Sequence, residues 1–393
     1  MTPLRIVADE NIPLLEAFCG HLGTISRVNG RTLARDDLQG ADVLLVRSVT
    51  RVDPALLAGS PVKFVGTATI GTDHIELGWL QTEGIAFSAA PGCNADSVVQ
   101  YVLSVLSLFL QRNQRHTLEG LTVGVIGAGN VGGGLVQVLS DLGITVRVSD
   151  PPREAAGAAL PFAVLEDVLA CDVVTLHTPL IENGAHPTRY LLDHRQLNRL
   201  RGHQLLINSG RGAVVDNRAL LSRLNQPDAP LVALDVWENE PSPMPELVDR
   251  CWLATPHIAG YSVEGKSRGT EMIARKLHEW AGVPMTASLE QLLPPPPVAA
   301  LTVTAECDPI TALHRALMVC YDPRDDDARL RKLMADGTAS GEPGAVSFDC
   351  LRKHYPVRRE PASLKVQFEE DSAAARMLAR AGFGTVITGP LSD

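Results

Sequence analysis

The chain has 393 residues, of which 45% are hydrophobic and 20% charged, and its formal net charge is −10. This length predicts two or three domains with full hydrophobic cores, and the composition is typical of a globular protein in water. The acidic excess argues against a nucleic-acid partner, because a phosphate-binding surface needs an excess of basic residues.

Neither end of the sequence nor its interior predicts a membrane segment. The N-terminus enters a strand-like run directly, without the long apolar segment of a secretory signal. The most apolar helical stretch, residues 97–110, has about 14 residues, whereas a bilayer span needs roughly 20. We therefore expect a cytoplasmic protein with no membrane partner and a buried helix here. The seven cysteines are scattered and form no C-x-x-C pair, so we expect reduced thiols and no metal site.

Strand-like and helical runs alternate over residues 1–95. Strands are predicted at 5–8, 43–46, 62–65 and 85–88, and helices at 12–22, 55–58 and 74–82. This alternation predicts a parallel sheet with helices on both faces. Ligands gather at the carboxyl ends of strands in such sheets, so Arg47, Ser48 and the loop 67–72 are candidates for ligand contact.

A helix over 95–112 leads into the stretch 121–150, which predicts a dinucleotide-binding strand, glycine turn and helix. Gly127 permits a tight turn after the buried strand, and Gly129 allows backbone N–H groups to approach a pyrophosphate. Gly132 lets the following helix pack closely on the sheet. The helix N-terminus then faces the anion.

The next strand, 144–148, ends at Asp150, eighteen positions after the third glycine. A carboxylate there accepts a hydrogen bond from the ribose 2′-hydroxyl and repels a 2′-phosphate, so NAD is favoured over NADP. Gly133 and Gly134 extend the glycine run into the helix, where each costs about 1 kcal/mol relative to Ala. Close approach of another backbone is one explanation for them.

Four more buried strands complete a six-stranded nucleotide-binding sheet, and each ends in a polar loop. They are predicted at 172–176, 204–207, 231–236 and 251–254.

The run Pro294–Pro297 predicts a stiff linker, since four prolines join neither a helix interior nor a central strand. Beyond it, strand patterns at 301–304, 364–368 and 385–387 and helical patterns at 310–320, 326–334 and 373–381 indicate a small α+β domain. It carries no catalytic motif, so we expect it to serve assembly, with a small-molecule regulatory module as the alternative.

Three strand-end loops each supply one candidate for chemistry: Arg211, Glu240 and His257. A guanidinium binds a carboxylate through two parallel hydrogen bonds. A histidine accepts and returns a proton near neutral pH, and a carboxylate on its far ring nitrogen fixes the tautomer. Together they suit oxidation of an alcohol beside a carboxylate, with the hydride passing to nicotinamide.

The motifs GAGNVG, HTPL, NSGRGAVVDN, ALDVWENEP and TPHIAG resemble the D-isomer-specific 2-hydroxyacid dehydrogenase family over about residues 1–290. The resemblance implies Arg211 as carboxylate binder, His257 as acid and base, and Glu240 as its partner. It also implies a discontinuous substrate domain, completed by a helix after Gly260. The NAD contacts it implies, besides the glycines of the turn, are Asn130, Val131, Asp150, Thr178, Ser209, Gly210, Asp235 and Gly260.

A narrower resemblance lies in VADEN, VRSVT, KFVGTATIGTDH, SAAPGCNADSVVQYV and PHIAGYSVEGKSRGT. These motifs are similar to a branch of the family that oxidises a phosphorylated 2-hydroxy acid and forms homodimers through its C-terminal domain. This resemblance implies that Ser48, Thr69 and Tyr261 contact substrate, and we add Arg47 because a phosphoester needs a nearby cation. The alternatives are a branch acting on a phosphorylated acid one carbon shorter, another dehydrogenase of the same family, or a non-catalytic NAD(H)-sensing protein.

The sequence thus predicts an α/β protein with three parts. These are a Rossmann-type NAD domain at 96–261, a flavodoxin-like discontinuous substrate domain at 1–95 and 262–290, and a small α+β dimerisation domain at 291–393.

Overall fold

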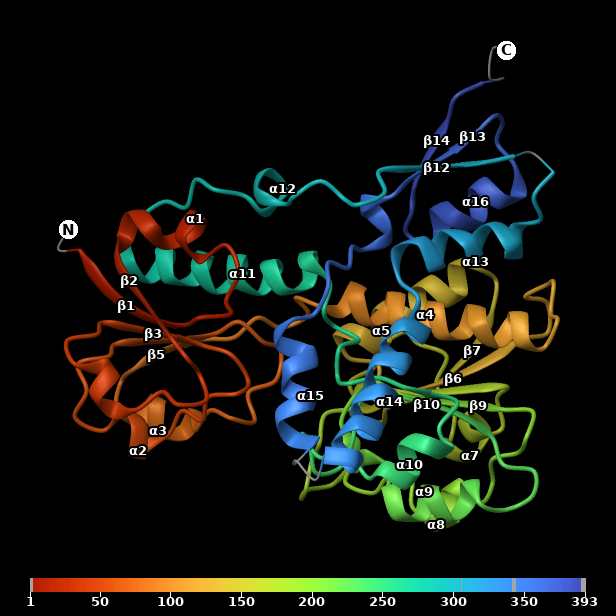
Figure 1. Cartoon of the computed structure of the whole chain (residues 1–393), viewed down its shortest axis with the longest axis horizontal. Helices are drawn as coiled ribbons and strands as arrows, with labels where there is room; N and C mark the ends of the chain where they lie inside the picture. Colours follow the sequence, from red (N-terminus) through yellow and green to blue (C-terminus); the bar gives the residue numbers. More distant parts are fainter. Residues whose placement is uncertain (1–2, 305, 341–343, 390–393) are drawn as a thin grey trace. The chain divides into compact units, whose positions relative to one another are not determined.

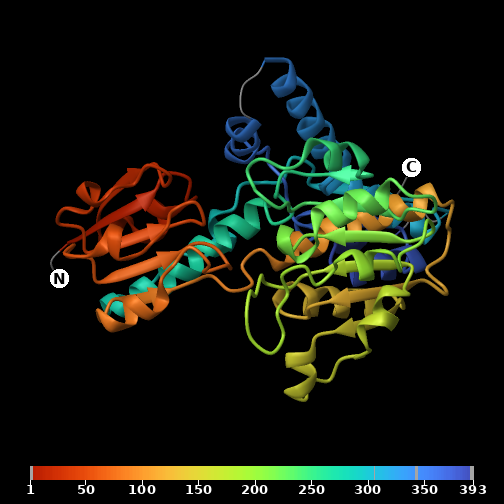
Figure 2. The same cartoon turned by 90° about the horizontal axis from the view of Figure 1, so that it is seen from below.

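The computed structural model describes residues 3–304, 306–340 and 344–389. The chain divides into two compact units (Figures 1 and 2). The first unit holds the residues up to Asn94 together with Tyr261–Pro295, and the second holds Ala95–Gly260 together with the residues from Pro296 on. The chain thus passes from the second unit to the first after Gly260. It returns to the second unit after Pro295, within the predicted proline linker.

The first unit is built on a five-stranded parallel sheet in the order β2-β1-β3-β4-β5. Helices α1 and α11 cover one apolar face, and α2 and α3 lie against the other. The strands are β1 (Leu4–Asp9), β2 (Gly23–Val28), β3 (Val43–Val46), β4 (Phe64–Thr67) and β5 (Ala86–Ser88), and the helices are α1 (Leu15–Cys19), α2 (Pro54–Leu57), α3 (Leu77–Thr82), α11 (Val263–Ala281) and α12 (Leu289–Leu292).

The structure of this unit differs from the prediction in two places. Strand β2 was not predicted, because this edge strand is only partly buried and carries Thr24, Ser26 and Arg27. The helix predicted over 12–22 is shorter, since Leu14 adopts a left-handed backbone conformation (φ 55°) and the regular helix begins only after it.

The second unit contains the predicted six-stranded parallel sheet, in the order β11-β10-β9-β8-β6-β7. The direction of strand progression reverses between β6 and β8, which makes the carboxyl ends of these two strands the expected ligand crevice. The strands are β6 (Thr122–Ile126), β7 (Thr145–Ser149), β8 (Val173–Leu176), β9 (Leu205–Asn208), β10 (Leu231–Leu234) and β11 (Leu253–Ala254), and the flanking helices are α4 (Ala95–Arg112), α5 (Asn130–Asp141), α6 (Pro151–Ala155), α7 (Leu165–Leu169), α8 (His194–Leu197), α9 (Asn217–Leu224) and α10 (Pro245–Arg250).

Helix α4 is buried from Ser97 to Leu110, as predicted. It packs against α5, and a Cβ added at Gly134 of α5 would lie 3.8 Å from Val99 of α4, an ordinary contact. A Cβ at Gly133 would lie 3.2 Å from the carbonyl oxygen of Ala128. The backbone of the glycine turn therefore crowds Gly133, whereas sterics do not require a glycine at position 134.

A small C-terminal domain is present, as predicted. Its three-stranded parallel sheet is β12 (Ala300–Val303), β13 (Lys365–Phe368) and β14 (Gly384–Ile387). Helices α13 (Pro309–Cys320) and α16 (Ala373–Arg380) pack together beside it, and Figure 1 shows α13 between α16 and α4.

The remaining helices of this domain, α14 (Pro323–Ser340) and α15 (Gly344–Lys353), pack on the nucleotide-binding sheet instead. Helix α14 contacts β11 and α10, and Leu330 and Phe348 are fully buried in the same apolar cluster as the strands of that sheet. Helix α15 was not predicted. The C-terminal residues therefore contribute to the core of the nucleotide-binding unit.

The close packing of the glycine turn yields a stability prediction. A Cβ at Gly132 would lie 1.9 Å from the carbonyl oxygen of Gly127, whereas a Cβ at Gly129 meets no described atom within 4 Å. Overpacking of this kind costs about 1–3 kcal/mol. Gly132→Ala should therefore lower the thermal midpoint clearly, and Gly129→Ala should leave it near the wild-type value. Equal midpoints for the two variants would contradict the packing described.

Candidate active site

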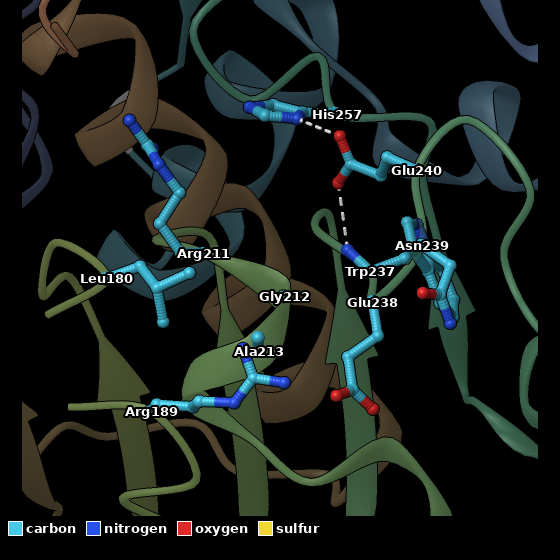
Figure 3. Close-up of a pocket in the computed structure, with 10 residues that line it drawn as sticks. All are labelled: Leu180, Arg189, Arg211, Gly212, Ala213, Trp237, Glu238, Asn239, Glu240 and His257. Atoms are coloured by element: carbon cyan, nitrogen blue, oxygen red, sulfur yellow. Dashed lines mark hydrogen bonds and ion pairs between the residues drawn. The ribbon is translucent and has the colours of Figure 1, made fainter. Parts of the chain in front are cut away.

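A pocket of about 310 Å³ opens at the carboxyl ends of the strands of the nucleotide-binding sheet. Figure 3 shows that it brings together all three candidates for chemistry, Arg211, Glu240 and His257. They come from the loops after β9, β10 and β11. The other lining residues are Leu180, Arg189, Gly212, Ala213, Trp237, Glu238 and Asn239.

The side chains of His257 and Glu240 form a short ion pair. The Nδ1 atom of His257 lies 2.6 Å from Oε2 of Glu240, and the other carboxylate oxygen accepts a hydrogen bond from the Trp237 N–H at 2.9 Å. Because Nδ1 is engaged by the carboxylate, Nε2 is the ring nitrogen available for proton transfer. In Figure 3 that nitrogen points to the side of the pocket where the Arg211 side chain lies.

The pKa of Glu240 is below its ordinary value. Burial alone would raise this pKa, but the positive charge of His257 and hydrogen bonds from His257 and the Trp237 N–H outweigh that effect. Glu240 therefore stays ionised near neutral pH and can orient the imidazole ring and stabilise its protonated form.

The loop that carries His257 is held from inside by Asp235, which is 1% exposed. One carboxylate oxygen accepts hydrogen bonds from the Thr255 hydroxyl at 2.6 Å and the Ile258 N–H at 2.8 Å, and the other accepts from the Ala259 N–H at 2.9 Å. This loop places His257 in a left-handed conformation, with φ at 56°, which is uncommon outside glycine. The bonds to Asp235 maintain that geometry.

Arg211 lies in the loop after β9, directly before the short 3-10 helix Gly212–Val214, and lines the pocket. One of its guanidinium nitrogens donates a hydrogen bond to the carbonyl oxygen of Gly210 at 3.0 Å, which ties the side chain to its own loop. The planar fork of a guanidinium matches the geometry of a carboxylate.

The glycine turn, the loop after β8 and the loop after β9 meet where the strand order reverses. A Cβ at Gly127 would clash with Thr178, and a Cβ at Gly210 would lie 3.0 Å from the Thr178 carbonyl oxygen. The Thr178 hydroxyl is buried and has no hydrogen-bond partner among the described residues. The open space at Gly129 and this unpartnered hydroxyl fit a bound dinucleotide.

Asp150 follows β7 and caps the N-terminus of α6. Its carboxylate accepts from the Ala128 N–H at 2.8 Å and the Arg153 N–H at 3.1 Å, so it braces the glycine turn. The other predicted nucleotide contacts also follow strands of this sheet. Asn130 and Val131 begin α5, Ser209 follows β9, and Gly260 ends the His257 loop.

In the first unit, two cations lie around Tyr261. Arg47, directly after β3, donates to the Tyr261 hydroxyl at 3.5 Å, and Nζ of Lys266 lies 5.3 Å from the centre of the tyrosine ring. Burial and the charge of Arg47 lower the pKa of Lys266. One carboxylate moderates this charge, since Asp9 lies 4.0 Å from Arg47.

The other predicted substrate residues also belong to this unit. Thr69 follows β4, and its hydroxyl bonds the Thr67 hydroxyl at 2.8 Å and donates to the Gly71 carbonyl oxygen at 3.2 Å. Ser48 is exposed in the loop after β3.

Sequence reasoning missed three groups near these sites. Lys266 lies in the first turns of α11 beside Tyr261, and the spacing of five residues between them was the available signal. The Tyr101 hydroxyl lies 3.1 Å from Thr255, and only the fold brings these residues together. His177 contacts the Ser209 hydroxyl through Nδ1 at 3.3 Å and the Thr175 hydroxyl through Nε2 at 3.0 Å.

Among the residues that the structure describes, no helix is long and apolar enough to cross a membrane. The same residues contain no group of three or more His, Cys, Asp or Glu side chains that could hold a metal ion.

Two family models match parts of the sequence. Residues 108–259 match the NAD binding domain of D-isomer specific 2-hydroxyacid dehydrogenases, and residues 292–382 match a domain of unknown function (DUF3410). Erythronate-4-phosphate dehydrogenase of Marinobacter nauticus is 55% identical over 371 residues, which are 94% of this chain and 96% of that protein. The protein of that name in Pseudomonas aeruginosa is 52% identical over 92% of this chain and 95% of its own length.

Solved structures of dehydrogenases share the fold. D-lactate dehydrogenase of Aquifex aeolicus, complexed with NAD and lactic acid, matches with a TM-score of 0.57 and 20% identity over 71% of this chain and 95% of its own. NAD-dependent formate dehydrogenase of Staphylococcus aureus, in complex with NAD, matches with a TM-score of 0.56 and 22% identity over 72% and 97% of the two chains.

The histidine behind Ser209 makes stability depend on pH. Burial lowers the pKa of His177 from 6.5 to about 3, so the unfolded chain binds the proton first as pH falls. Without NAD, the free energy of unfolding should drop by about 2 kcal/mol from pH 7.5 to pH 5 through this group alone.

His177→Gln should abolish this part of the loss, measured by urea unfolding at both pH values. The matched control is His203→Gln, which changes an exposed histidine of the same domain and should keep the wild-type loss. An undiminished loss in His177→Gln would contradict the assigned burial.

Proposed function

We propose, since this chain belongs to the D-isomer-specific 2-hydroxyacid dehydrogenase family, that it oxidises C2 of 4-phospho-D-erythronate to 2-oxo-3-hydroxy-4-phosphobutanoate. The chain is an NAD-dependent dehydrogenase, and relatives at 47–55% identity over more than nine-tenths of its length carry the name of this activity. The observation that carries the proposal is the His257–Glu240 pair in one pocket with Arg211.

The three side chains divide the work of oxidising a 2-hydroxy acid. Nε2 of His257 accepts the proton of the C2 hydroxyl, while Glu240 holds Nδ1 and stabilises the imidazolium that forms. Arg211 binds the C1 carboxylate through its planar fork and so orients C2. NAD, when bound, takes the C2 hydrogen as a hydride.

We place the nucleotide in the crevice where the strand order reverses, and this placement assigns the residues that would bind it. The turn at Gly127, Gly129 and Gly132 would hold the pyrophosphate, and Asp150 would accept from the adenosine ribose. Thr178 supports this assignment, because its buried hydroxyl gains a partner only from a bound molecule or a rearrangement of its neighbours. Asp235 would act through the His257 loop, since both of its carboxylate oxygens already accept hydrogen bonds from that loop.

The first unit would bind the 4-phosphate. Arg47 and Lys266 place two positive charges around the Tyr261 hydroxyl, with Asp9 offsetting part of one. The hydroxyls of Ser48 and Thr69 follow neighbouring strands β3 and β4 of the same sheet. A phosphomonoester at pH 7 carries between one and two negative charges, so two cations match it.

The C-terminal domain would pair two copies of the chain into a homodimer in the cytoplasm, where the reaction would serve synthesis of pyridoxal 5′-phosphate. The narrower sequence resemblance supports these proposals.

The proposed base gives the first activity test. His257→Gln removes the proton acceptor and should lower kcat by about 10²- to 10⁴-fold, while NADH affinity changes little. Turnover is followed at 340 nm with NAD and 4-phospho-D-erythronate, and NADH binding by fluorescence.

Other outcomes of this experiment would indicate a different role for His257, a different substrate or a non-catalytic function. An equal loss of turnover and NADH affinity would place His257 in the nucleotide site instead. If the wild-type protein prefers 3-phosphoglycerate, the substrate assignment is wrong. If it binds NADH but turns over neither phosphorylated acid, an NAD(H)-sensing role replaces catalysis.

The proposed phosphate site gives the second activity test. Lys266→Met should raise KM for 4-phospho-D-erythronate by about 10- to 100-fold, the range expected for a charged hydrogen bond. Its effect on any oxidation of unphosphorylated D-erythronate should be small. Lys276→Met is the matched control, because Lys276 is an exposed lysine on the same helix that pairs with Glu279. Equal losses on both substrates would remove Lys266 from the phosphate.

A further inference from the structure

An arginine of the C-terminal domain lies buried against the nucleotide-binding domain. Arg358 belongs to the segment after α15 and is 3% exposed. The next two residues, Arg359 and Glu360, are also buried. Charged side chains are seldom fully buried without specific partners, so this segment has a defined polar role.

The guanidinium of Arg358 joins two parts of the nucleotide-binding domain. It donates to the carbonyl oxygen of Ser97 at 2.6 Å and to the amide oxygen of Gln100 at 3.1 Å, both on α4. A third hydrogen bond, at 3.3 Å, goes to the carbonyl oxygen of Ile258. The Cζ atom of the guanidinium also lies 3.7 Å from the centre of the Tyr321 ring.

Ile258 directly follows His257. Its N–H group donates to Asp235, and its carbonyl oxygen accepts from Arg358. The residue next to His257 is thus held at its N–H by the strand β10 loop and at its carbonyl by the C-terminal domain. Both bonds act on the residue that directly follows the left-handed His257.

The C-terminal domain supports the same loop by a second route. Tyr101 of α4 contacts the Thr255 hydroxyl at 3.1 Å, and its ring packs 6.0 Å from that of Tyr321. Because the Asp235 carboxylate only accepts, the Thr255 hydroxyl donates to it, and the Tyr101 hydroxyl donates to Thr255.

From these contacts we propose that Arg358 is a positioning residue for His257, so that the C-terminal domain helps to set the proton acceptor. This inference rests on the proposed role of His257. Packing alone does not account for Arg358, because an apolar side chain fills such a space without the cost of desolvating a charge. Its planar set of donors matches the three separate carbonyl and amide oxygens, which a single ammonium cannot reach together.

The test compares Arg358→Met, which keeps the aliphatic stem, with Arg358→Lys in the full chain. Arg331→Met is the matched control, because Arg331 of α14 also anchors the C-terminal domain, to the carbonyl oxygens of Val248 and Cys251. The readouts are kcat, KM for each substrate, the pH profile of kcat/KM and the thermal midpoint.

Misplacement of a reacting group by about 1 Å can cost on the order of 10²-fold in rate. We expect Arg358→Met to lower kcat about 10- to 100-fold, to change both KM values less than about threefold, and to alter the pH profile. Arg358→Lys should recover part of kcat. Arg331→Met should lose comparable thermal stability yet keep kcat and the pH profile.

A kcat in Arg358→Met that falls no further than in Arg331→Met, with an unchanged pH profile, would overturn the proposal. If Arg358→Met fails to fold, Arg358→Lys carries the comparison with the same criteria. If the wild-type protein oxidises neither phosphorylated acid, the proposed function fails separately. The positioning role is then decided by the NMR titration of the His257 ring, identified with His257→Gln, which Arg358→Lys should displace and Arg331→Met should not.

Discussion

The arrangement of the active site depends on the buried carboxylate of Asp235. Its two oxygens accept three hydrogen bonds from residues 255–259, and the backbone of that loop consequently places His257 in a left-handed conformation. In that arrangement Nδ1 of His257 lies 2.6 Å from Oε2 of Glu240. Hydrogen bonds to both oxygens stabilise the buried charge of Asp235, and loss of a donor would remove part of that stabilisation. The backbone geometry of this loop thus holds His257, the proposed proton acceptor.

Parallel strands explain how residues far apart in sequence reach one pocket. The carboxyl ends of β8, β9, β10 and β11 lie along one edge of the sheet, so each following loop contributes to the same crevice. The C-terminal domain adds to this by packing α14 and α15 into the core of that sheet and Arg358 onto the His257 loop. Its contribution to the site is therefore mechanical support, distinct from the proposed pairing of two chains.

The sequence predicted all six strands of the nucleotide-binding sheet and four of the five strands of the first unit, because buried strands between glycine or polar loops are strong local patterns. It also singled out Arg211, Glu240 and His257, three of the residues that line the pocket, since each follows a strand. It could not predict β2, whose exposed edge lacks a continuous apolar run, or α15. The roles of Arg358 and Asp235 depend on contacts between distant segments, and no local pattern distinguishes Arg358 from a surface arginine. Lys266 was recognisable only once α11 placed it beside Tyr261.

In the proposed reaction, this site removes a hydride from C2 of a phosphorylated 2-hydroxy acid while His257 takes the hydroxyl proton. The most direct test follows deuterium from 4-phospho-D-erythronate labelled at C2 during a single turnover with NAD. We expect the label to be recovered on the nicotinamide ring of NADH, and unlabelled substrate to react faster than labelled substrate in the chemical step. Recovery of the deuterium in water, or NADH formed without the label, would contradict the proposed hydride transfer.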